Sequence, residues 1–324
     1  MKKWIIISTL IGIALFISVF FRLGLGDVIE TFKKANFIYL IPYLIFFIAI
    51  FIGIQYRLKI ILKAHGFSIS LLKLLPIGFS GFAVSYLTPS AQVGGEPVRA
   101  YLLSKQGMKY SKALASAVID KSLELSVNAF FAFVGLILFL LKFALPRKAE
   151  IVISFSIVLL IVFLFVLYYR LARGLGFFSE LFRILGFNRI KYKHILKIEK
   201  TILDMESHIT KFFKHKTKTL ILTLLLSLFL WICMFLEYKL ALLMFGLDAS
   251  FYVIFLVITV VGIAYIFPIP AALGVLEVGQ ASLFAIIGLP VSIGVAASIL
   301  LRARDLTWTF LGLINLFLHG FKRK

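Results

Sequence analysis

The sequence predicts an all-α integral membrane protein, a polytopic helical bundle with two inverted re-entrant helical hairpins. Hydrophobic residues make up 62% of the chain, and the mean hydropathy is +1.06. A soluble core cannot hide this much apolar surface, so lipid must be the solvent. Because lipid cannot hydrogen-bond to the backbone, the spanning elements must be helices, and two apolar runs broken by proline and glycine predict the hairpins.

Six apolar runs are long enough to cross a membrane as helices. The first follows Lys2 and Lys3 and lacks a small-residue cleavage signal, so we expect a retained helix rather than a signal peptide. The second ends in the cations Arg57, Lys59 and Lys63. The six predicted spans are 4–21, 37–56, 111–141, 151–169, 219–236 and 291–318.

Two further apolar runs, 74–95 and 249–276, are interrupted. Pro76, Gly78 and Gly81 already break the pattern early in the first run, and a short polar helix is expected at 96–105. Backbone groups freed in mid-membrane are tolerated only where protein or cavity water satisfies them, so the breaks predict the walls of a polar cavity. The predicted hairpin breaks are Pro89, Gly94 and Gly95 in the first run and Pro268, Pro270 and Gly274 in the second.

The two broken runs keep register with each other, which predicts an internal duplication. The first repeat would cover about 37–169 and the second about 219–319, within a single membrane domain of residues 1–324. A shift of 181 residues places Pro89 on Pro270, Glu96 on Glu277, Gly107 on Gly288, Lys121 on Arg302 and Glu124 on Asp305.

Between the repeats, residues 170–218 hold twelve Lys and Arg and no spanning run. Apolar residues at steps of three and four predict two amphipathic helices joined near Gly186 and Asn188. They would pack on each other as a basic cytoplasmic hairpin or lie on the membrane surface.

The distribution of Lys and Arg predicts the topology. With both broken runs treated as re-entrant hairpins, 25 of these residues face inside and 6 outside, so both termini and residues 170–218 would be cytoplasmic in a multi-pass protein of the cell membrane. The hairpins then enter from opposite sides, and a substrate site would lie between them at the midplane. The net charge of +21 is attributed to this orientation and to anionic lipid headgroups, with no role for nucleic acid.

Charged residues within membrane segments are costly, so each is functional or paired. Asp120 and Glu124 share one helix face. The alternative is that each base only neutralises a carboxylate and fixes helix packing. Glu237 and Lys239, late in their helix, are expected to snorkel to the outer headgroups. The candidate substrate-binding residues are Glu96, Arg99, Asp120, Lys121, Glu124, Glu277, Arg302, Arg304 and Asp305.

No catalytic or metal-ligating signature is present in the sequence. The five histidines are scattered, Cys233 is the single cysteine, and there is no nucleotide-binding motif. We therefore expect no catalytic residues, no metal and no cofactor.

The residues around the two breaks carry a family resemblance. Leu87-Thr-Pro89 with Gly94-Gly95-Glu96 and Arg99, followed by Pro268-Ile-Pro270, Gly274, Glu277, Gly288 and Arg302, resembles the lysylphosphatidylglycerol synthase transmembrane-region family, also called the flippase-like domain. The resemblance implies lipid translocation and not lipid synthesis, since the chain has no room for an aminoacyl-transferase domain. Ala271 and Ala272 stand where that family commonly has glycines.

The leading hypothesis is a lipid translocase, and not an enzyme, which moves a charged lipid headgroup through a midplane cavity. Anionic or aminoacylated phospholipids and polyprenyl-phosphate-linked lipids all fit a cavity with both signs of charge. One alternative is a membrane-embedded lipid-modifying enzyme with Glu96 or Asp120 as general base. Another is an interaction subunit that acts through the basic cytoplasmic hairpin.

Overall fold

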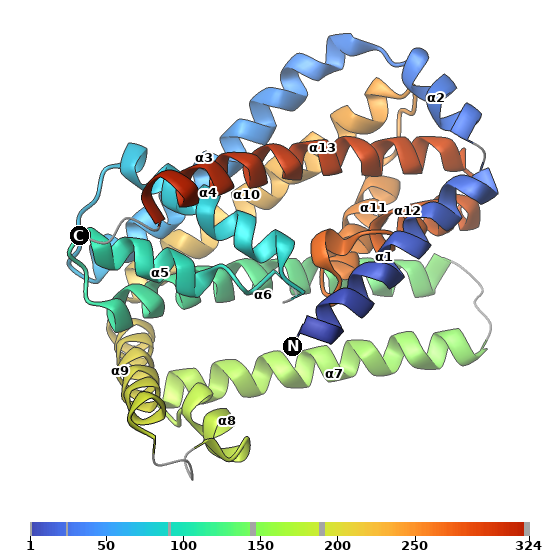
Figure 1. Ribbon diagram of the computed structural model, residues 1–324. Coiled ribbons are helices and arrows are strands. Elements are labelled where there is room, and N and C mark those ends of the chain that lie inside the picture. The colour runs from blue at the N-terminus through green and yellow to red at the C-terminus, as the bar shows by residue number, and fades with distance from the viewer. Residues whose placement is uncertain (1, 24, 90–91, 143–146, 188–191, 321–324) are drawn as a thin grey trace.

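Long helices run side by side through the molecule, with shorter helices between and across them (Figure 1). The computed structural model describes residues 2–23, 25–89, 92–142, 147–187 and 192–320, and these residues contain no strand. The elements in chain order are α1 (Lys2–Leu23), α2 (Leu25–Lys33), η1 (Phe37–Tyr39), α3 (Leu40–Ala64), α4 (Leu71–Leu87), α5 (Glu96–Lys105), α6 (Tyr110–Lys142), α7 (Arg147–Arg173), α8 (Phe178–Ile184), α9 (Lys193–His215), α10 (Thr217–Met244), α11 (Phe251–Ala264), η3 (Pro270–Ala272), α12 (Val275–Ile286), α13 (Val291–Asn315) and η4 (Leu316–Gly320).

The helices have the length and polarity of membrane spans. Within the described residues, Phe37–Ala64, Tyr110–Lys142 and Thr217–Met244 are long and apolar enough to cross a membrane, and α1, α7 and α13 cover the other predicted runs. Large apolar side chains face outward, with Ile41 69% exposed and Phe165 68% exposed. A soluble protein would not present such surface to water, so the prediction of an all-α membrane protein is confirmed.

Two four-helix units repeat one order of elements: a long helix, a broken helix pair and a second long helix. The units are α3–α6 and α10–α13. Gly66 and Gly246 end the first helix of each unit with φ of 76° and 82°. Ser70 and Ser250 then cap α4 and α11 by accepting from the backbone N–H three residues on. The two glycines and the two serines are each 180 residues apart. This spacing is one residue shorter than the shift of 181 that places Pro89 on Pro270 and aligns the residues after them.

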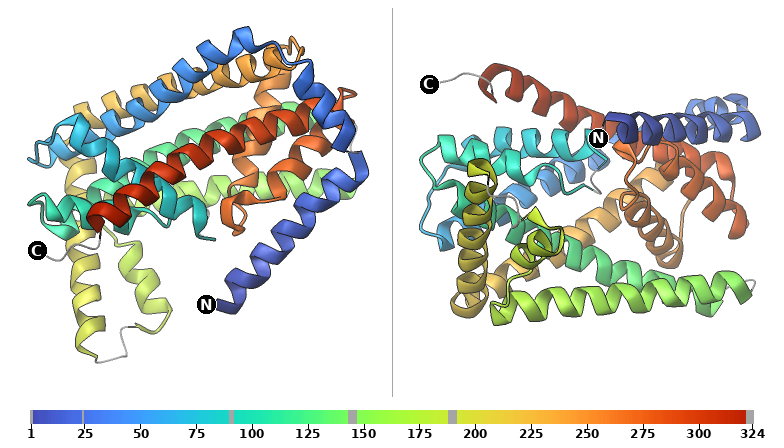
Figure 2. Two further views of the ribbon diagram at one scale, coloured as in Figure 1. Left: turned by 45° about the horizontal axis from the view of Figure 1, so that its top comes forward. Right: turned by 60° about the horizontal axis from the view of Figure 1, so that its bottom comes forward.

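The two units are inverted relative to each other and interleaved. α3 runs antiparallel to α10, since the N–H of Asn36, just before α3, donates to the carbonyl of Met244 at the end of α10 (2.8 Å; Figure 2). α4 packs on α13 and α11 packs on α6. The first helix of each broken pair therefore lies against the second long helix of the other unit, while α5 and α12 pack on α6 and α13 of their own units.

The first broken segment starts later than predicted. Pro76, Gly78 and Gly81 do not interrupt α4, which runs unbroken from Leu71 to Leu87. Pro76 has no N–H, so it removes only the helical bond to the carbonyl of Leu72. Leu72 lies in the first turn of α4, and the residue is 81% exposed. The six predicted break residues do lie between helices, Pro89, Gly94 and Gly95 between α4 and α5, and Pro268, Pro270 and Gly274 between α11 and α12. Whether each pair enters and leaves the membrane on one side stays a prediction.

The basic segment 170–218 differs from the predicted pair of similar amphipathic helices. α7 continues to Arg173, and Gly174 and Gly176, with φ of 73° and 65°, turn the chain before α8, which has seven residues. These two glycines end the first predicted helix because side chains rarely adopt this backbone conformation. The predicted junction at Asn188 lies outside the described residues.

α9 docks on the bundle and is not confined to a pairing with α8. It crosses the ends of α6 and α7 (Figure 2) and buries Met205, Ile209 and Phe212 against apolar residues of α3 and α6. Glu206 also accepts from the N–H groups of Phe178 (2.5 Å) and Ser179 (3.0 Å) at the start of α8. The α8–α9 segment is thus joined to the membrane helices by a packed core.

Candidate functional site

The first unit holds a buried charge cluster centred on Asp120, which we call cluster 1. Asp120 of α6 is fully buried and accepts from Arg57 Nε of α3 (2.7 Å) and from Arg99 of α5 (3.1 Å). Glu124, one turn further along α6, accepts from Arg57 (3.2 Å) and from Lys121 Nζ (2.6 Å). Hydrogen bonds between ionised groups are about twice as strong as neutral ones, so this network holds three helices together.

Glu96 and Arg99 bring cluster 1 to the first hairpin break. Glu96 opens α5 directly after Gly95 and is 5% exposed. Its Oε2, like Nε of Arg99, has no hydrogen-bond partner among the described residues. Since buried polar groups are normally paired, these two atoms are suited to accept and donate to a ligand.

The backbone at this break is closely packed. The N–H of Gly95 donates to Ser85 Oγ (2.8 Å), and a Cβ on Gly95 would lie 2.0 Å from the carbonyl oxygen of Gly81 on α4. Only glycine fits here, and the contact places the start of α5 and Glu96 against α4.

The second unit holds cluster 2, which begins at Glu277. This carboxylate is fully buried in the first turn of α12, where Oε2 accepts from the N–H of Gly274 (2.9 Å) and so caps the helix. Its Oε1 accepts from both Nε (2.8 Å) and NH2 (2.6 Å) of Arg302 on α13. The remaining NH1 of Arg302 donates to Tyr86 Oη of α4 (3.3 Å) and to the carbonyl of Ala271 (3.2 Å). Arg302 therefore links the two hairpin breaks.

Arg304 forms the other half of cluster 2. Its NH1 donates to both oxygens of Glu237 on α10 (3.2 and 3.0 Å), and its Nε donates to Asp305 (2.9 Å). Tyr265, at the end of α11, donates to the other oxygen of Asp305. Glu237 and Asp305 are 1% and 2% exposed, so both carboxylates depend on Arg304 for compensation.

The two clusters occupy matching places with one reversal of charge. Glu96 and Glu277 both lie in the first turn of the helix after a break, and Lys121 and Arg302 lie at the same place in the second long helix. Arg57 of α3, however, matches Glu237 of α10 at the 180-residue spacing. Cluster 1 consists of Arg57, Glu96, Arg99, Asp120, Lys121 and Glu124, and cluster 2 consists of Glu237, Glu277, Arg302, Arg304 and Asp305.

The two breaks meet, but the space between them is small. The pocket between the described residues of the two breaks has a volume of about 10 Å³, which is about the least that a single water molecule needs. The site is therefore closed in this conformation. The pocket is lined by Ser85, Tyr86, Thr88 and Gln92 from the first break and by Tyr265, Phe267, Ile269, Ala271 and Ala272 from the second.

Ala271 and Ala272 adopt backbone conformations that favour glycine. Their φ angles are 57° and 48°, in the left-handed region where an L side chain costs about 1 kcal/mol. The sequence shows alanine at both places, so the strain is held by the surroundings, which include the Arg302 bond to the Ala271 carbonyl.

All nine predicted substrate-binding residues lie in the two clusters, but two members were missed. Arg57 was taken for a cation at the end of its span, yet it is 2% exposed and joins Asp120 to Glu124. The prediction that Glu237 snorkels is wrong, because Glu237 is buried against Arg304; Lys239, by contrast, pairs with exposed Asp248. A search for ionisable pairs at the 180-residue spacing would have found both residues. Among the described residues, no group of three or more histidine, cysteine or acidic side chains could hold a metal ion.

Comparison with known proteins gives one matching family model, described as the lysylphosphatidylglycerol synthase TM region, over residues 5–312. A UPF0104 membrane protein of Methanothermobacter thermautotrophicus is 26% identical over 310 residues, which cover 91% of this chain and 89% of the relative. A UPF0104 membrane protein of Pyrococcus horikoshii is 26% identical over 316 residues, covering 93% and 92%. A third, from Archaeoglobus fulgidus, is 25% identical over 258 residues, covering 78% and 77%.

Proposed function

The chain belongs to the lysylphosphatidylglycerol synthase TM region family, and we propose that it is a lipid translocase, which moves a charged lipid headgroup across the membrane between its two units. The observation that carries the proposal is the position of clusters 1 and 2. Eleven ionisable side chains lie in the membrane helices beside two broken helix pairs that touch each other. Each charge costs a few kcal/mol in a membrane, and such a concentration at broken helices is typical of a substrate path.

Arg302 is the residue best placed to receive a phosphate. Glu277 engages Nε and NH2, so the guanidinium stays oriented and its charge stays compensated. Among the described residues, NH1 donates to two neutral acceptors, Tyr86 Oη and the Ala271 carbonyl. A phosphate oxygen between the breaks would replace these two acceptors with a stronger one, without breaking the pair with Glu277.

Transport requires the two breaks to separate, because about 10 Å³ cannot hold a headgroup. In an inverted repeat, movement of one unit against the other opens a central site to one side and then to the other. Here the Arg302 bonds to Tyr86 and Ala271 are the polar links that close the site, and a bound phosphate would compete for them.

The charge balance supports a headgroup that carries both signs of charge. With every group ionised, clusters 1 and 2 contain five cations and six carboxylates. A phosphate is attracted to the arginines, and an amino group on the same headgroup would offset the excess carboxylate. An aminoacylated phospholipid has this pattern, and anionic or polyprenyl-phosphate-linked lipids share its phosphate.

The topology that goes with this proposal places both termini and residues 170–218 in the cytoplasm of a cell-membrane protein. The surplus of Lys and Arg on that side supports it.

Reconstitution into vesicles tests the proposal. Labelled lipids of each class are placed in both leaflets, and loss of signal on adding an impermeant quencher reports transbilayer movement. We expect Arg302→Ala and Glu277→Gln to slow movement by about tenfold or more, since each loses a charge-assisted bond. Arg173→Ala and Glu199→Gln, outside both clusters, are the matched controls.

Two outcomes would overturn the proposal. Parent-like rates in both cluster variants, at equal reconstitution and unchanged oligomeric state, would mean that the clusters only hold the helices together. A lipid whose mass changes during the incubation would instead identify a lipid-modifying enzyme.

A further inference from the structure

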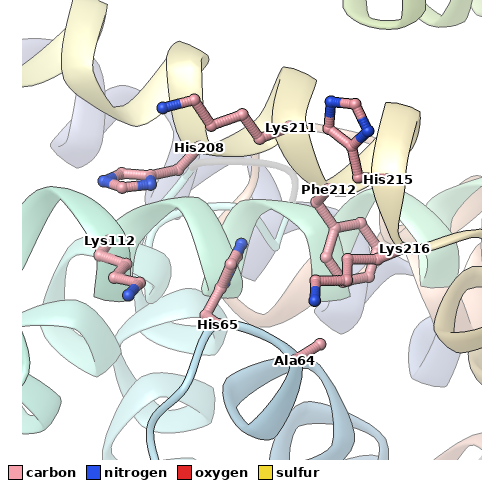
Figure 3. A pocket seen from close by; sticks show the side chains of 8 residues that line it. All are labelled: Ala64, His65, Lys112, His208, Lys211, Phe212, His215 and Lys216. Carbon is pink, nitrogen blue, oxygen red and sulfur yellow. The ribbon is translucent and has the colours of Figure 1, made fainter.

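A second pocket, of about 350 Å³, lies away from both clusters, between the end of α3, the start of α6 and the last turns of α9 (Figure 3). It is separated from Arg57 by two turns of α3, about 12 Å. Ala64 and Phe212 give it an apolar floor, and none of its described lining residues is acidic. Its six basic residues are His65, Lys112, His208, Lys211, His215 and Lys216.

His65 points from the end of α3 toward α9, between His208 and Phe212 (Figure 3). Its Nδ1 lies 2.7 Å from Ser116 Oγ, and that hydroxyl already donates its hydrogen to the carbonyl of Lys112 (3.0 Å). In the tautomer that matches this bond, His65 carries its proton on Nδ1 and donates it to Ser116 Oγ. Nε2 is left as a bare acceptor, buried and without a hydrogen-bond partner among the described residues. Protonation would add a donor at Nε2 and a positive charge to a residue that lines the pocket.

The lysines leave the pocket strongly positive. Lys112, Lys211 and Lys216 make no ion pair with any described residue. Asp204, which lies 3.8 Å from His208, is already engaged by Lys109 (2.6 Å) and Ser111 (2.5 Å). Three ammonium groups would repel a metal cation, so the three histidines do not make a metal site here. The site is suited to a compact anion.

We propose that this pocket binds a phosphate group, carried by a lipid headgroup at the membrane surface or by a small soluble molecule. A phosphate has the charge and the acceptor oxygens to engage the lysines and a protonated His65 at the same time. The volume is within the range of small-molecule sites. The proposal does not depend on lipid translocation, since none of the six basic residues belongs to cluster 1 or cluster 2.

Binding should be linked to proton uptake. Burial lowers the pKa of His65 to about 4, with His208, Lys112 and Lys216 as facing cations that act in the same direction. Burial also lowers the pKa of His208. The positive charges of Lys112, Lys211 and Lys109 lower it further, whereas Asp204 raises it. A bound anion would offset these effects and raise both pKa values, so affinity should rise as pH falls. Sulfate is the probe for this measurement, because its charge does not change across the range in which histidine titrates.

The test compares two variants of the purified protein. Lys112→Gln with Lys216→Gln removes two pocket charges from partly or fully exposed positions, so folding should be preserved. Lys200→Gln with Lys214→Gln removes the same charge from α9 outside the pocket and is the control. Inorganic phosphate and sulfate are titrated calorimetrically, and phosphatidic acid and phosphatidylcholine are compared by native mass spectrometry.

We expect the pocket variant to bind at least about tenfold more weakly than the control and the parent. Preference for phosphatidic acid over inorganic phosphate would identify a lipid headgroup, and the reverse a soluble phosphate. Equal binding by both variants, no binding of either probe by the parent, or tight Zn²⁺ binding in place of phosphate would overturn the proposal.

Discussion

Replacing Asp120 by asparagine is expected to destabilise the protein by about 3 kcal/mol. Among the described residues, Asp120 is the one carboxylate that pairs with both Arg57 and Arg99, which are 2% and 7% exposed. Removing one partner of a buried ion pair typically costs 3–5 kcal/mol, because the other charge stays buried. The lower end applies here, since Arg57 keeps Glu124 (3.2 Å) and Ser227 (3.1 Å) and asparagine can still accept one bond.

Equilibrium unfolding in mixed micelles of increasing SDS content, followed by tryptophan fluorescence, measures this loss. Asp248→Asn is the matched control, because Asp248 is also paired but its side chain is 82% exposed, and exposed pairs contribute little. Adding Arg99→Gln to Asp120→Asn should recover part of the loss, as the second change removes one orphaned charge. A loss below about 1 kcal/mol, or one equal to that of Asp248→Asn, would refute the view that cluster 1 is sealed from water.

Three further predictions follow from the geometry. Ala271→Gly should stabilise the protein by about 1 kcal/mol by relieving a φ of 57°; an unchanged unfolding midpoint would show that the backbone there is relaxed. In a Cys233→Ser background, an impermeant maleimide applied to intact cells should label Asp248→Cys and not Gln106→Cys, both being exposed positions; the opposite pattern would reverse the topology. Without phosphate, stability should fall as pH drops from about 6.5 toward the folded pKa of His65, about 4, because the unfolded chain takes up the proton first; His65→Gln should flatten this slope, and an equal slope would contradict the assignment.

The features that follow from local chemistry could be predicted from the sequence. Hydropathy defines the spans, and α5 begins at Glu96 and ends at Lys105 as expected. The breaks at Pro89 and Pro270 could be located because proline and glycine act on their own backbone. Glu96 and Glu277 were found because a carboxylate beside a break has no other obvious reason to be in a membrane.

The features that depend on three-dimensional neighbours could not be predicted. Pro76 in the sequence predicts a helix break, but whether a proline there interrupts α4 depends on how exposed the first turn of the helix is. Glu237 reads as a headgroup contact until α13 brings Arg304 against it. The pairing of Arg302 with Glu277 crosses from α13 to α12, whereas the sequence directs attention to Asp305 one turn away. For Glu237 and Glu277 the deciding partner is supplied by a different helix, α13.

The interleaving of the two units determines the order in which the protein can mature. Tyr86 of α4 meets Arg302 of α13 across 216 residues of sequence. At about 5–20 residues per second, the ribosome needs roughly 10–40 s to make that stretch. During this interval α4 lacks α13, the helix against which it packs. We therefore expect a chain truncated before α13 to be less stable than the full chain, because α4 then lacks the helix on which it packs.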